Sequence, residues 1–243
     1  MMEKIVLNIP HSSVNGIFDA YGKWPQDPRF ISECVAKWTD WFTDFLFTSN
    51  NSKVAGIVFP YSRFVCDVER LDNDPMEALG QGILYRRFND FVRGKLSAEA
   101  EDHLYALRRE HLNRLKSLLT PGSVLIDCHS FPSELHECDI CIGFNDDQTY
   151  DERLVHAVRQ QFEDMHYNVA LNQPYSNSIA PDTGFTYKSL MIEVNKKVYL
   201  DGNCCLKQDE AEWHRWFSCI NNIYRRILDM LLRSGESPSV VRG

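Results

Sequence analysis

Short apolar runs alternate along the chain with longer segments in which apolar residues recur every three or four positions. The runs typical of buried strands are 5–9, 54–59, 64–68, 123–127, 139–144 and 190–194, with 168–171 as an edge strand. Helical spacing covers 31–47, 85–119, 151–166 and 208–232. Strands that alternate with helices in this order predict an α/β fold, with a largely parallel sheet covered by helices on both faces.

Polar residues stand near the carboxyl ends of three predicted strands, where parallel α/β sheets collect their ligands. His11 follows the first strand, His129 lies just past 123–127, and Glu193 lies in the last strand. Neutral imidazole is a common metal ligand, and a buried carboxylate is costly unless it is paired, hydrogen-bonded or near a metal. The pattern therefore raises the hypothesis of a metal site. Structural histidines, and a glutamate on the solvated face of an edge strand, are the alternatives.

Three more polar residues are candidates for the same site. Asp40 stands among aromatic residues in the predicted helix 31–47, although the helical spacing by itself favours a surface aspartate. Arg63 and Arg70 flank the predicted strand 64–68, and arginine is suited to binding carboxylates and stabilising oxyanions. Salt bridges to neighbouring carboxylates are the alternative reading of both arginines.

Composition narrows the class of protein. The chain has 243 residues, which fits a single domain over 1–243 with a frayed tail at 236–243. The formal net charge of -8 argues against a nucleic-acid partner. No apolar run approaches the roughly 18 residues that span a membrane, and the N-terminus lacks the layout of a signal peptide. We therefore expect a cytoplasmic protein with no membrane partner, and the oligomeric state stays open.

The cysteines and the common catalytic motifs add little to this picture. Eight cysteines in a chain without a signal peptide predict free, mostly buried thiols. This includes Cys138 and Cys141, whose spacing resembles half of a zinc site but has no second pair to complete it. The sequence contains no G-x-S-x-G elbow, P-loop, G-x-G-x-x-G or H-E-x-x-H motif. Function must therefore be sought in the residues at the strand ends.

Several short stretches follow one another in the order found in one known family. They are 9–13 (Ile-Pro-His-Ser-Ser), 39–47, 61–70 (Tyr-Ser-Arg-Phe-Val-Cys-Asp-Val-Glu-Arg), 127–131 (Asp-Cys-His-Ser-Phe), 139–144, 172–176 (Asn-Gln-Pro-Tyr-Ser) and 192–195 (Ile-Glu-Val-Asn) with Tyr199. Together they resemble the N-formylglutamate amidohydrolase family, whose relatives include zinc carboxypeptidases and aspartoacylases. The resemblance implies a three-layer α/β/α sandwich with a mixed, mainly parallel sheet of the phosphorylase/hydrolase type.

The resemblance also implies a catalytic role for five of the matching residues. One zinc ion would be held by His11, Asp40 and His129. Glu193 would act first as the general base and then as the general acid, and Arg63 would stabilise the oxyanion. The expected reaction is the zinc-dependent hydrolysis of the linear amide in an N-acyl amino acid such as N-formylglutamate.

The resemblance further implies that the substrate is a small molecule with a carboxylate. Arg70 would grip that carboxylate, with support from Asp67 or Glu69. The remaining residues that would contact the substrate are Ser12, Ser130 and Tyr199. Two other functions fit the same residues. One is a zinc peptidase or amidase acting on peptide or cell-wall substrates, and the other is a non-catalytic binding domain that keeps the fold.

Overall fold

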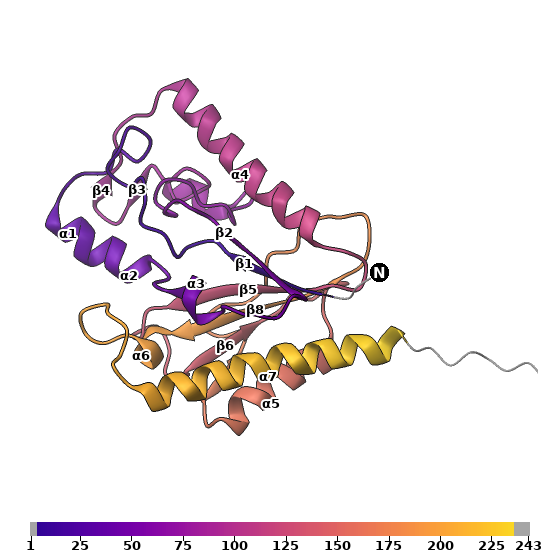
Figure 1. Cartoon of the computed structure of the whole chain (residues 1–243). Coiled ribbons are helices and arrows are strands. Elements are labelled where there is room, and N and C mark those ends of the chain that lie inside the picture. The colour runs from indigo at the N-terminus through magenta and orange to yellow at the C-terminus, as the bar shows by residue number, and fades with distance from the viewer. Residues whose placement is uncertain (1–3, 236–243) are drawn as a thin grey trace, which may run out of the picture.

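A six-stranded mixed sheet forms the centre of the computed structural model, which describes residues 4–235 (Figure 1). Across the sheet the strands are β2 (Val54–Val58), β1 (Ile5–Ile9), β5 (Val124–Phe131), β8 (Lys188–Asn195), β6 (Ile140–Gly143) and β7 (Val169–Leu171). Neighbouring strands from β2 to β8 are parallel, whereas β6 runs antiparallel to β8 and parallel to β7. The predicted α/β architecture with a mainly parallel sheet is confirmed, and 168–171 does form an edge strand.

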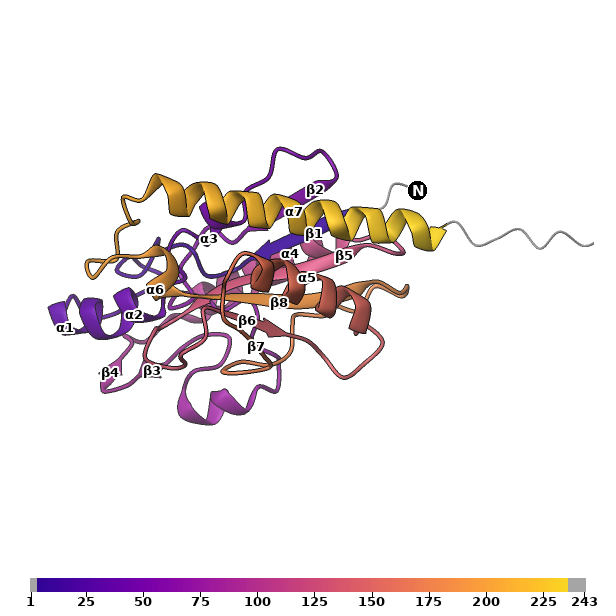
Figure 2. The same cartoon turned by 90° about the horizontal axis from the view of Figure 1, so that it is seen from below.

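Helices cover both faces of this sheet. Helix α4 (Ala98–Leu118) lies on one face, and α5 (Glu152–Asp164) and α7 (Glu210–Gly235) lie together on the other (Figures 1 and 2). The shorter elements are α1 (Pro28–Phe30), a π-helical turn (Ile31–Val35), α2 (Ala36–Trp38), α3 (Thr43–Leu46), a 3-10 turn (Pro75–Leu79), the hairpin strands β3 (Arg87–Phe88) and β4 (Phe91–Val92), and α6 (Lys196–Tyr199). Across residues 4–235, the search for a helix of sufficient length and apolar character to cross a membrane finds none.

The two faces of the sheet differ in polarity because strand side chains alternate between them. The face toward α5 and α7 is mainly apolar, with Ser130 as a polar exception, and buries the larger core, which contains Ile126, Ile192 and Trp216. The face toward α4 is apolar only near the amino ends of the strands, where Leu125 packs on Leu115. Toward the carboxyl ends the same face turns polar, and this is where the candidate site lies.

Helix α7 also fixes the segment that carries α3. The indole Nε1 of Trp216 donates to the carbonyl oxygen of Leu46 at 2.9 Å, and the Tyr224 hydroxyl donates to that of Phe47 at 2.9 Å. All four residues are buried. Buried carbonyls at a helix end need such partners, so α7 both covers the sheet and terminates α3.

The predicted helix 31–47 is wrong as a continuous element. The chain leaves the helix at Thr39, which has extended geometry, and Phe42 adopts a left-handed φ of 59° before α3 begins. The backbone N–H of Asp40 then donates to the carbonyl oxygen of His11 at 3.0 Å. The apolar spacing continues across this break because both pieces bury residues, so periodicity did not reveal it. The break is what turns Asp40 toward the histidine at the end of β1.

Two further predictions were wrong for a shared reason. The segment 64–68 forms turns rather than a strand, and 85–119 is helical only over α4. The aromatic residues of these segments, Phe64, Tyr85 and Phe88, pack together in a separate cluster beside the sheet. Ser97 caps the true start of α4, since its side chain accepts a hydrogen bond from the N–H of Ala100. The tertiary packing of the aromatic residues therefore determines the structure of both segments.

The remaining sequence predictions have mixed outcomes. Strand β5 runs through Phe131, so His129 lies inside the strand rather than past its end. Strand β8 is central in the sheet, which excludes the edge-strand alternative for Glu193. All eight cysteines are free, six of them buried, as expected. The single-domain assignment stays a prediction, and the tail 236–243 lies outside the described residues.

Candidate active site

Two histidine rings meet one aspartate at the carboxyl ends of β1 and β5. The ring centroids of His11 and His129 lie 5.1 Å apart. Oδ2 of Asp40 lies 3.0 Å from Nδ1 of His129 and 3.7 Å from Nδ1 of His11. Asp40 is only 3% exposed, which excludes the surface aspartate that helical spacing favoured. The three residues predicted as metal ligands therefore share one buried cluster.

Glu193 lies beside this cluster because of the sheet register. His129 of β5 and Glu193 of β8 are direct partners in the parallel pairing, so both side chains leave the same face. Glu193 is 6% exposed, and its Oε2 has no hydrogen-bond partner among residues 4–235. Burial raises the pKa of Glu193 from its ordinary 4.5 to about 8, and the charges of Asp40 and Glu69 add to this although His129 opposes it. A carboxyl group so placed can exchange a proton near neutral pH.

The opposite nitrogen of each imidazole faces other carboxylates. Nε2 of His11 lies 3.0 Å from Asp67, and Nε2 of His129 lies 3.1 Å from Glu69 and 3.2 Å from Asp127. Burial by itself would lower the pKa of His129, but Glu69 and Asp127 hold it well above the ordinary value. Burial and the neighbouring Asp127 raise the pKa of Glu69 to about 7. Carboxylates thus lie against the Nε2 atom of each imidazole ring.

A buried amide supports these acids, and the sequence analysis missed it. Nδ2 of Asn8 donates to Glu69 Oε1 and to Asp127 Oδ1, both at 2.9 Å. Nε2 of His111, from α4, lies 2.9 Å from Oδ1 of the same asparagine. Burial lowers the pKa of His111 to about 4, so this ring is neutral at pH 7. A polar residue in the middle of the apolar strand β1 was the signal that could have pointed to the network.

Both predicted arginines converge on Asp67. Nη2 of Arg63 lies 3.0 Å from Asp67 Oδ2, and Nε of Arg70 lies 3.6 Å from the same oxygen. The Tyr85 hydroxyl also donates to that oxygen at 2.8 Å. The salt-bridge alternative is therefore present for both arginines. Within residues 4–235, Nε of each guanidinium is buried without a hydrogen-bond partner, although Nε of Arg70 lies within ion-pair distance of Asp67.

The three residues that were predicted to contact the substrate, Ser12, Ser130 and Tyr199, differ in where their side chains lie. Ser12 is half-buried next to His11. Ser130 follows His129 in β5, so its side chain leaves the opposite face of the sheet, and its Oγ accepts a hydrogen bond of 2.9 Å from the Tyr199 hydroxyl. Contact of these three with a substrate stays a prediction.

Two carboxylates are candidates to complete a site for one divalent ion with the two histidines. His11, Glu69 and His129 offer ligand atoms that all lie within 4.8 Å of one another. Asp40 is not part of that group, but its Oδ2 lies on the Nδ1 side of the same histidines, 3.0 Å from His129 and 3.7 Å from His11. Nδ1 of His11 is buried without a hydrogen-bond partner among the described residues. Metal-bound histidines usually donate their other ring nitrogen to a carboxylate, as the Nε2 atoms are placed to do here. Two imidazoles and one carboxylate are a donor set that suits catalytic zinc.

Comparison with known proteins identifies the family. The family model for N-formylglutamate amidohydrolase matches residues 3–200, a stretch that contains every residue discussed above for the site. The chain belongs to the N-formylglutamate amidohydrolase family. Membership supports an amidohydrolase activity on a small-molecule substrate, and the resemblance seen in the short motifs is confirmed.

Two solved structures share the fold of this chain. N-formylglutamate amidohydrolase from Ralstonia eutropha JMP134 has a TM-score of 0.76 and 19% identity, covering 96% of this chain and 95% of that one. A gene product from Agrobacterium tumefaciens has a TM-score of 0.60 and 15% identity, covering 96% and 91%. No curated protein sequence matches the chain significantly. At these identities the structural likeness concerns the fold alone.

Proposed function

We propose that this member of the N-formylglutamate amidohydrolase family hydrolyses the amide bond of an N-acyl amino acid with one zinc ion. The observation that carries the proposal is the meeting of His11, Asp40, His129 and Glu193 in one buried cluster at the carboxyl edge of the sheet. N-formylglutamate is the first candidate substrate, because the matched family takes its description from it.

Zinc is proposed to bind on the Nδ1 side, to His11, Asp40 and His129. Two observations support this side over the set that contains Glu69. Nδ1 of His11 is buried without a hydrogen-bond partner among residues 4–235 and faces Asp40 at 3.7 Å. The carboxylates at Nε2 would then orient the rings from behind, which is the usual arrangement around bound zinc. When bound, zinc would lower the pKa of a water molecule toward ~7 and polarise the scissile carbonyl.

Glu193 is proposed to move the proton in this reaction. Its Oε2, which has no hydrogen-bond partner within residues 4–235, would accept a proton from the attacking water and would then deliver it to the leaving nitrogen. The raised pKa of Glu193 suits both roles, since a group that titrates near neutral pH can accept and release a proton. Burial also excludes bulk water that would compete for this proton.

The arginines are proposed to bind the charges of substrate and transition state. The guanidinium of Arg63 is fixed by Asp67 and is proposed to donate to the oxyanion that forms at the carbonyl. Arg70 is anchored on the same aspartate and is suited to bind a carboxylate of the substrate. Both side chains are partly exposed, at 18% and 24%.

Metal content and activity together test the proposal. Gently purified protein should carry close to one equivalent of zinc, and chelation should abolish hydrolysis of N-formylglutamate until zinc is restored. Glu193→Gln should bind zinc but lose hydrolysis. A biological role that survives Glu193→Gln would instead favour the non-catalytic binding domain, and full activity without metal would refute the zinc mechanism.

A pair of variants separates the two donor sets. Asp40→Asn should weaken zinc binding by more than the roughly 10–100-fold typical of losing an outer contact. Glu69→Gln should stay within that range, because Glu69 is proposed to act through the His129 ring. Zinc affinity measured by competition with a chelator distinguishes the two, and the reverse order would assign Glu69 as the ligand.

A further inference from the structure

A tyrosine in the segment between β7 and β8 lies on the face of the sheet that carries the candidate active site. Tyr175 packs against a cluster that includes Phe131 and Cys141, and the Cys141 thiol donates to its backbone carbonyl at 3.2 Å. Cys141 of β6 is the direct partner of Glu193 in β8. Phe131 lies two residues after His129 in β5. Because paired residues, and residues two apart in one strand, leave the same face of a sheet, Tyr175 lies on the face of His129 and Glu193.

The backbone on both sides of Tyr175 is fixed to the sheet. Before it, the N–H of Asn172 donates to the carbonyl oxygen of Ile142 at 2.9 Å. After it, the N–H of Ile179 donates to Asp127 Oδ2 at 3.0 Å. Segments that are hydrogen-bonded to a sheet open less readily than loops that lack such bonds. The position of Tyr175 is therefore set by the fold before a ligand arrives.

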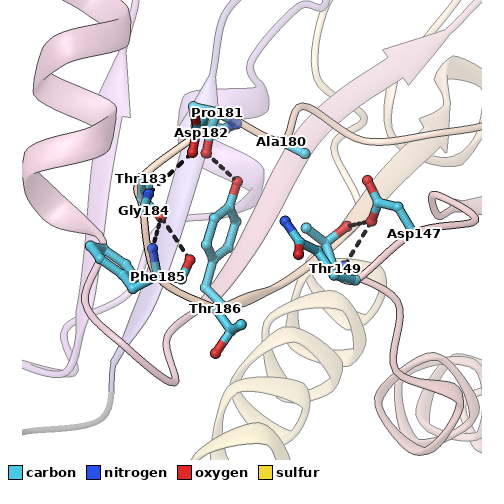
Figure 3. A pocket seen from close by; sticks show the side chains of 11 residues that line it. Asp147, Thr149, Ala180, Pro181, Asp182, Thr183, Gly184, Phe185 and Thr186 are labelled. Atoms are coloured by element: carbon cyan, nitrogen blue, oxygen red, sulfur yellow. Dashed lines mark hydrogen bonds between the residues drawn. The ribbon is translucent and has the colours of Figure 1, made fainter.

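The continuation of this segment is braced by hydrogen bonds of its own. Figure 3 shows the loop around Pro181 and Gly184, where the Tyr187 hydroxyl donates to the Pro181 carbonyl oxygen at 2.8 Å. The N–H of Gly184 donates to Asp182 Oδ1 at 3.1 Å. These bonds lie between Ile179 and the start of β8, so the segment is held along its length.

The Tyr175 hydroxyl, in contrast to its backbone carbonyl, has no hydrogen-bond partner among residues 4–235. Other tyrosines do have one, since the hydroxyls of Tyr85, Tyr199 and Tyr224 donate to an aspartate, a serine and a backbone carbonyl. The Tyr175 side chain is only half-buried, so its hydroxyl is open to water or to a bound ligand. A tyrosine with an apolar ring fixed by packing and an open hydroxyl is suited to binding a substrate atom.

The charges of the candidate active site act on this hydroxyl. Burial and the charge of Glu193 raise the pKa of Tyr175 from its ordinary 10 to about 12, although Arg63 opposes them. Asp40 and His129 act in the same two directions to a smaller extent. Such shifts come from charges that lie nearby, which agrees with the packing of Tyr175. The phenol is protonated at neutral pH, so it can donate a hydrogen bond but does not act as a base.

We infer, given the proposed hydrolysis, that Tyr175 is a further catalytic residue whose hydroxyl donates a hydrogen bond to the oxyanion at the scissile carbonyl, together with Arg63. Glu193 is proposed to serve the attacking water and the leaving nitrogen, which leaves the carbonyl oxygen as the reacting atom that needs donors. A neutral donor gains most where negative charge develops, because hydrogen bonds to a charged acceptor are roughly twice as strong as neutral ones. Tyr175 keeps its proton throughout, so the proton transfers proposed for Glu193 are unchanged.

Removal of this hydroxyl tests the inference in the full-length, zinc-loaded protein. Tyr175→Phe should lower kcat for N-formylglutamate by roughly 10²–10³-fold with little change in KM, since one oxyanion donor is lost. The free energy of unfolding should stay unchanged, because the hydroxyl has no partner in residues 4–235 to lose. Tyr150→Phe is the control, since Tyr150 is also half-buried but packs against the core on the opposite face. A raised KM with unchanged kcat, or equal effects of the two variants, would overturn the oxyanion role.

Binding separates this inference from the proposed function. The ligands are N-formylglutamate and its phosphinate analogue, in which a phosphinate anion and a methylene group replace the amide carbonyl and nitrogen. The phosphinate carries the charged tetrahedral oxygen that the amide acquires only in the reaction. Calorimetry on zinc-loaded Glu193→Gln, with and without Tyr175→Phe, measures both affinities in the absence of hydrolysis. Tyr175→Phe should weaken phosphinate binding by about tenfold or more, and amide binding less.

The outcomes for Tyr175 and for the hydrolase are independent. Selective loss of phosphinate affinity in Tyr175→Phe, with no hydrolysis by the wild type, would support the hydroxyl as an oxyanion donor and refute the hydrolase. Equal losses for both ligands, or none, would overturn the inference, and hydrolysis of N-formylglutamate by the wild type would then leave the hydrolase in place. A protein that binds no phosphinate overturns the inference whether or not it hydrolyses the amide.

Discussion

The buried carboxyl group of Glu193 should make the metal-free protein less stable as the pH rises. Its pKa is raised from 4.5 to about 8 in the folded state, so the folded chain holds this proton more tightly than the unfolded chain. The stabilising contribution is therefore present at low pH and is lost as pH rises through this interval. With these two pKa values, linkage gives a loss of roughly 4 kcal/mol between pH 5 and pH 9.

The comparison with Glu193→Gln isolates this loss. The variant cannot ionise at this position, and any constant cost of its buried amide cancels when the two pH values are subtracted. Urea unfolding of both proteins, stripped of metal, at pH 5 and pH 9 gives the four free energies of unfolding. The difference between variant and wild type should shift in favour of the variant by roughly 4 kcal/mol from pH 5 to pH 9. A difference independent of pH would refute the reasoning that Glu193 is a desolvated acid.

Three further substitutions test individual contacts. Arg63→Met should lower kcat by roughly 10²–10³-fold while zinc content stays the same, since one oxyanion donor is lost; an unchanged kcat would leave Arg63 only its salt bridge. Lys196→Met should weaken zinc binding roughly tenfold, because the buried Lys196 donates to the carbonyl oxygen of the residue three positions before Asp40. Its exposed neighbour Lys197 provides the control, and an equal effect of Lys197→Met would contradict this role. Tyr199→Phe should lower the free energy of unfolding by about 1 kcal/mol; a raised KM with unchanged stability would instead assign Tyr199 to the substrate.

The sequence predicted those parts of the fold that depend on local apolar patterns. The central strands and the helices α5 and α7 were found at nearly their observed positions, because continuous burial or a single buried stripe defines each of them. Prediction from the sequence failed where aromatic residues pack in a cluster separate from the core of the sheet. The spacing of Tyr85, Phe88 and Phe91 suits a helix, yet these side chains pack on Phe64 and Phe30 beside the sheet. No local rule distinguishes those two uses of the same residues.

In the candidate site too, some residues could be predicted from local sequence patterns and others could not. His11 and Glu193 could be found from strand ends and from burial of a charged residue in an apolar strand. Asp40 could not, because its position depends on a left-handed residue at Phe42 and on a hydrogen bond to a carbonyl far away in the sequence. Only the family motif pointed to it. Asn8 was detectable but was overlooked, as its single polar side chain interrupts an otherwise apolar strand.

The position of α7 has a consequence for how the protein can be divided. The family match ends at residue 200, while α7 begins at Glu210 and supplies much of the layer that covers the apolar face of the sheet. Residues 3–200, the part of the sequence that matches the family model, are therefore not a folding unit by themselves. A chain cut after Leu200 would retain every proposed catalytic residue and expose a broad apolar surface, which favours self-association. It would also remove the partners of the carbonyls of Leu46 and Phe47, so the segment behind Asp40 would lose its anchor.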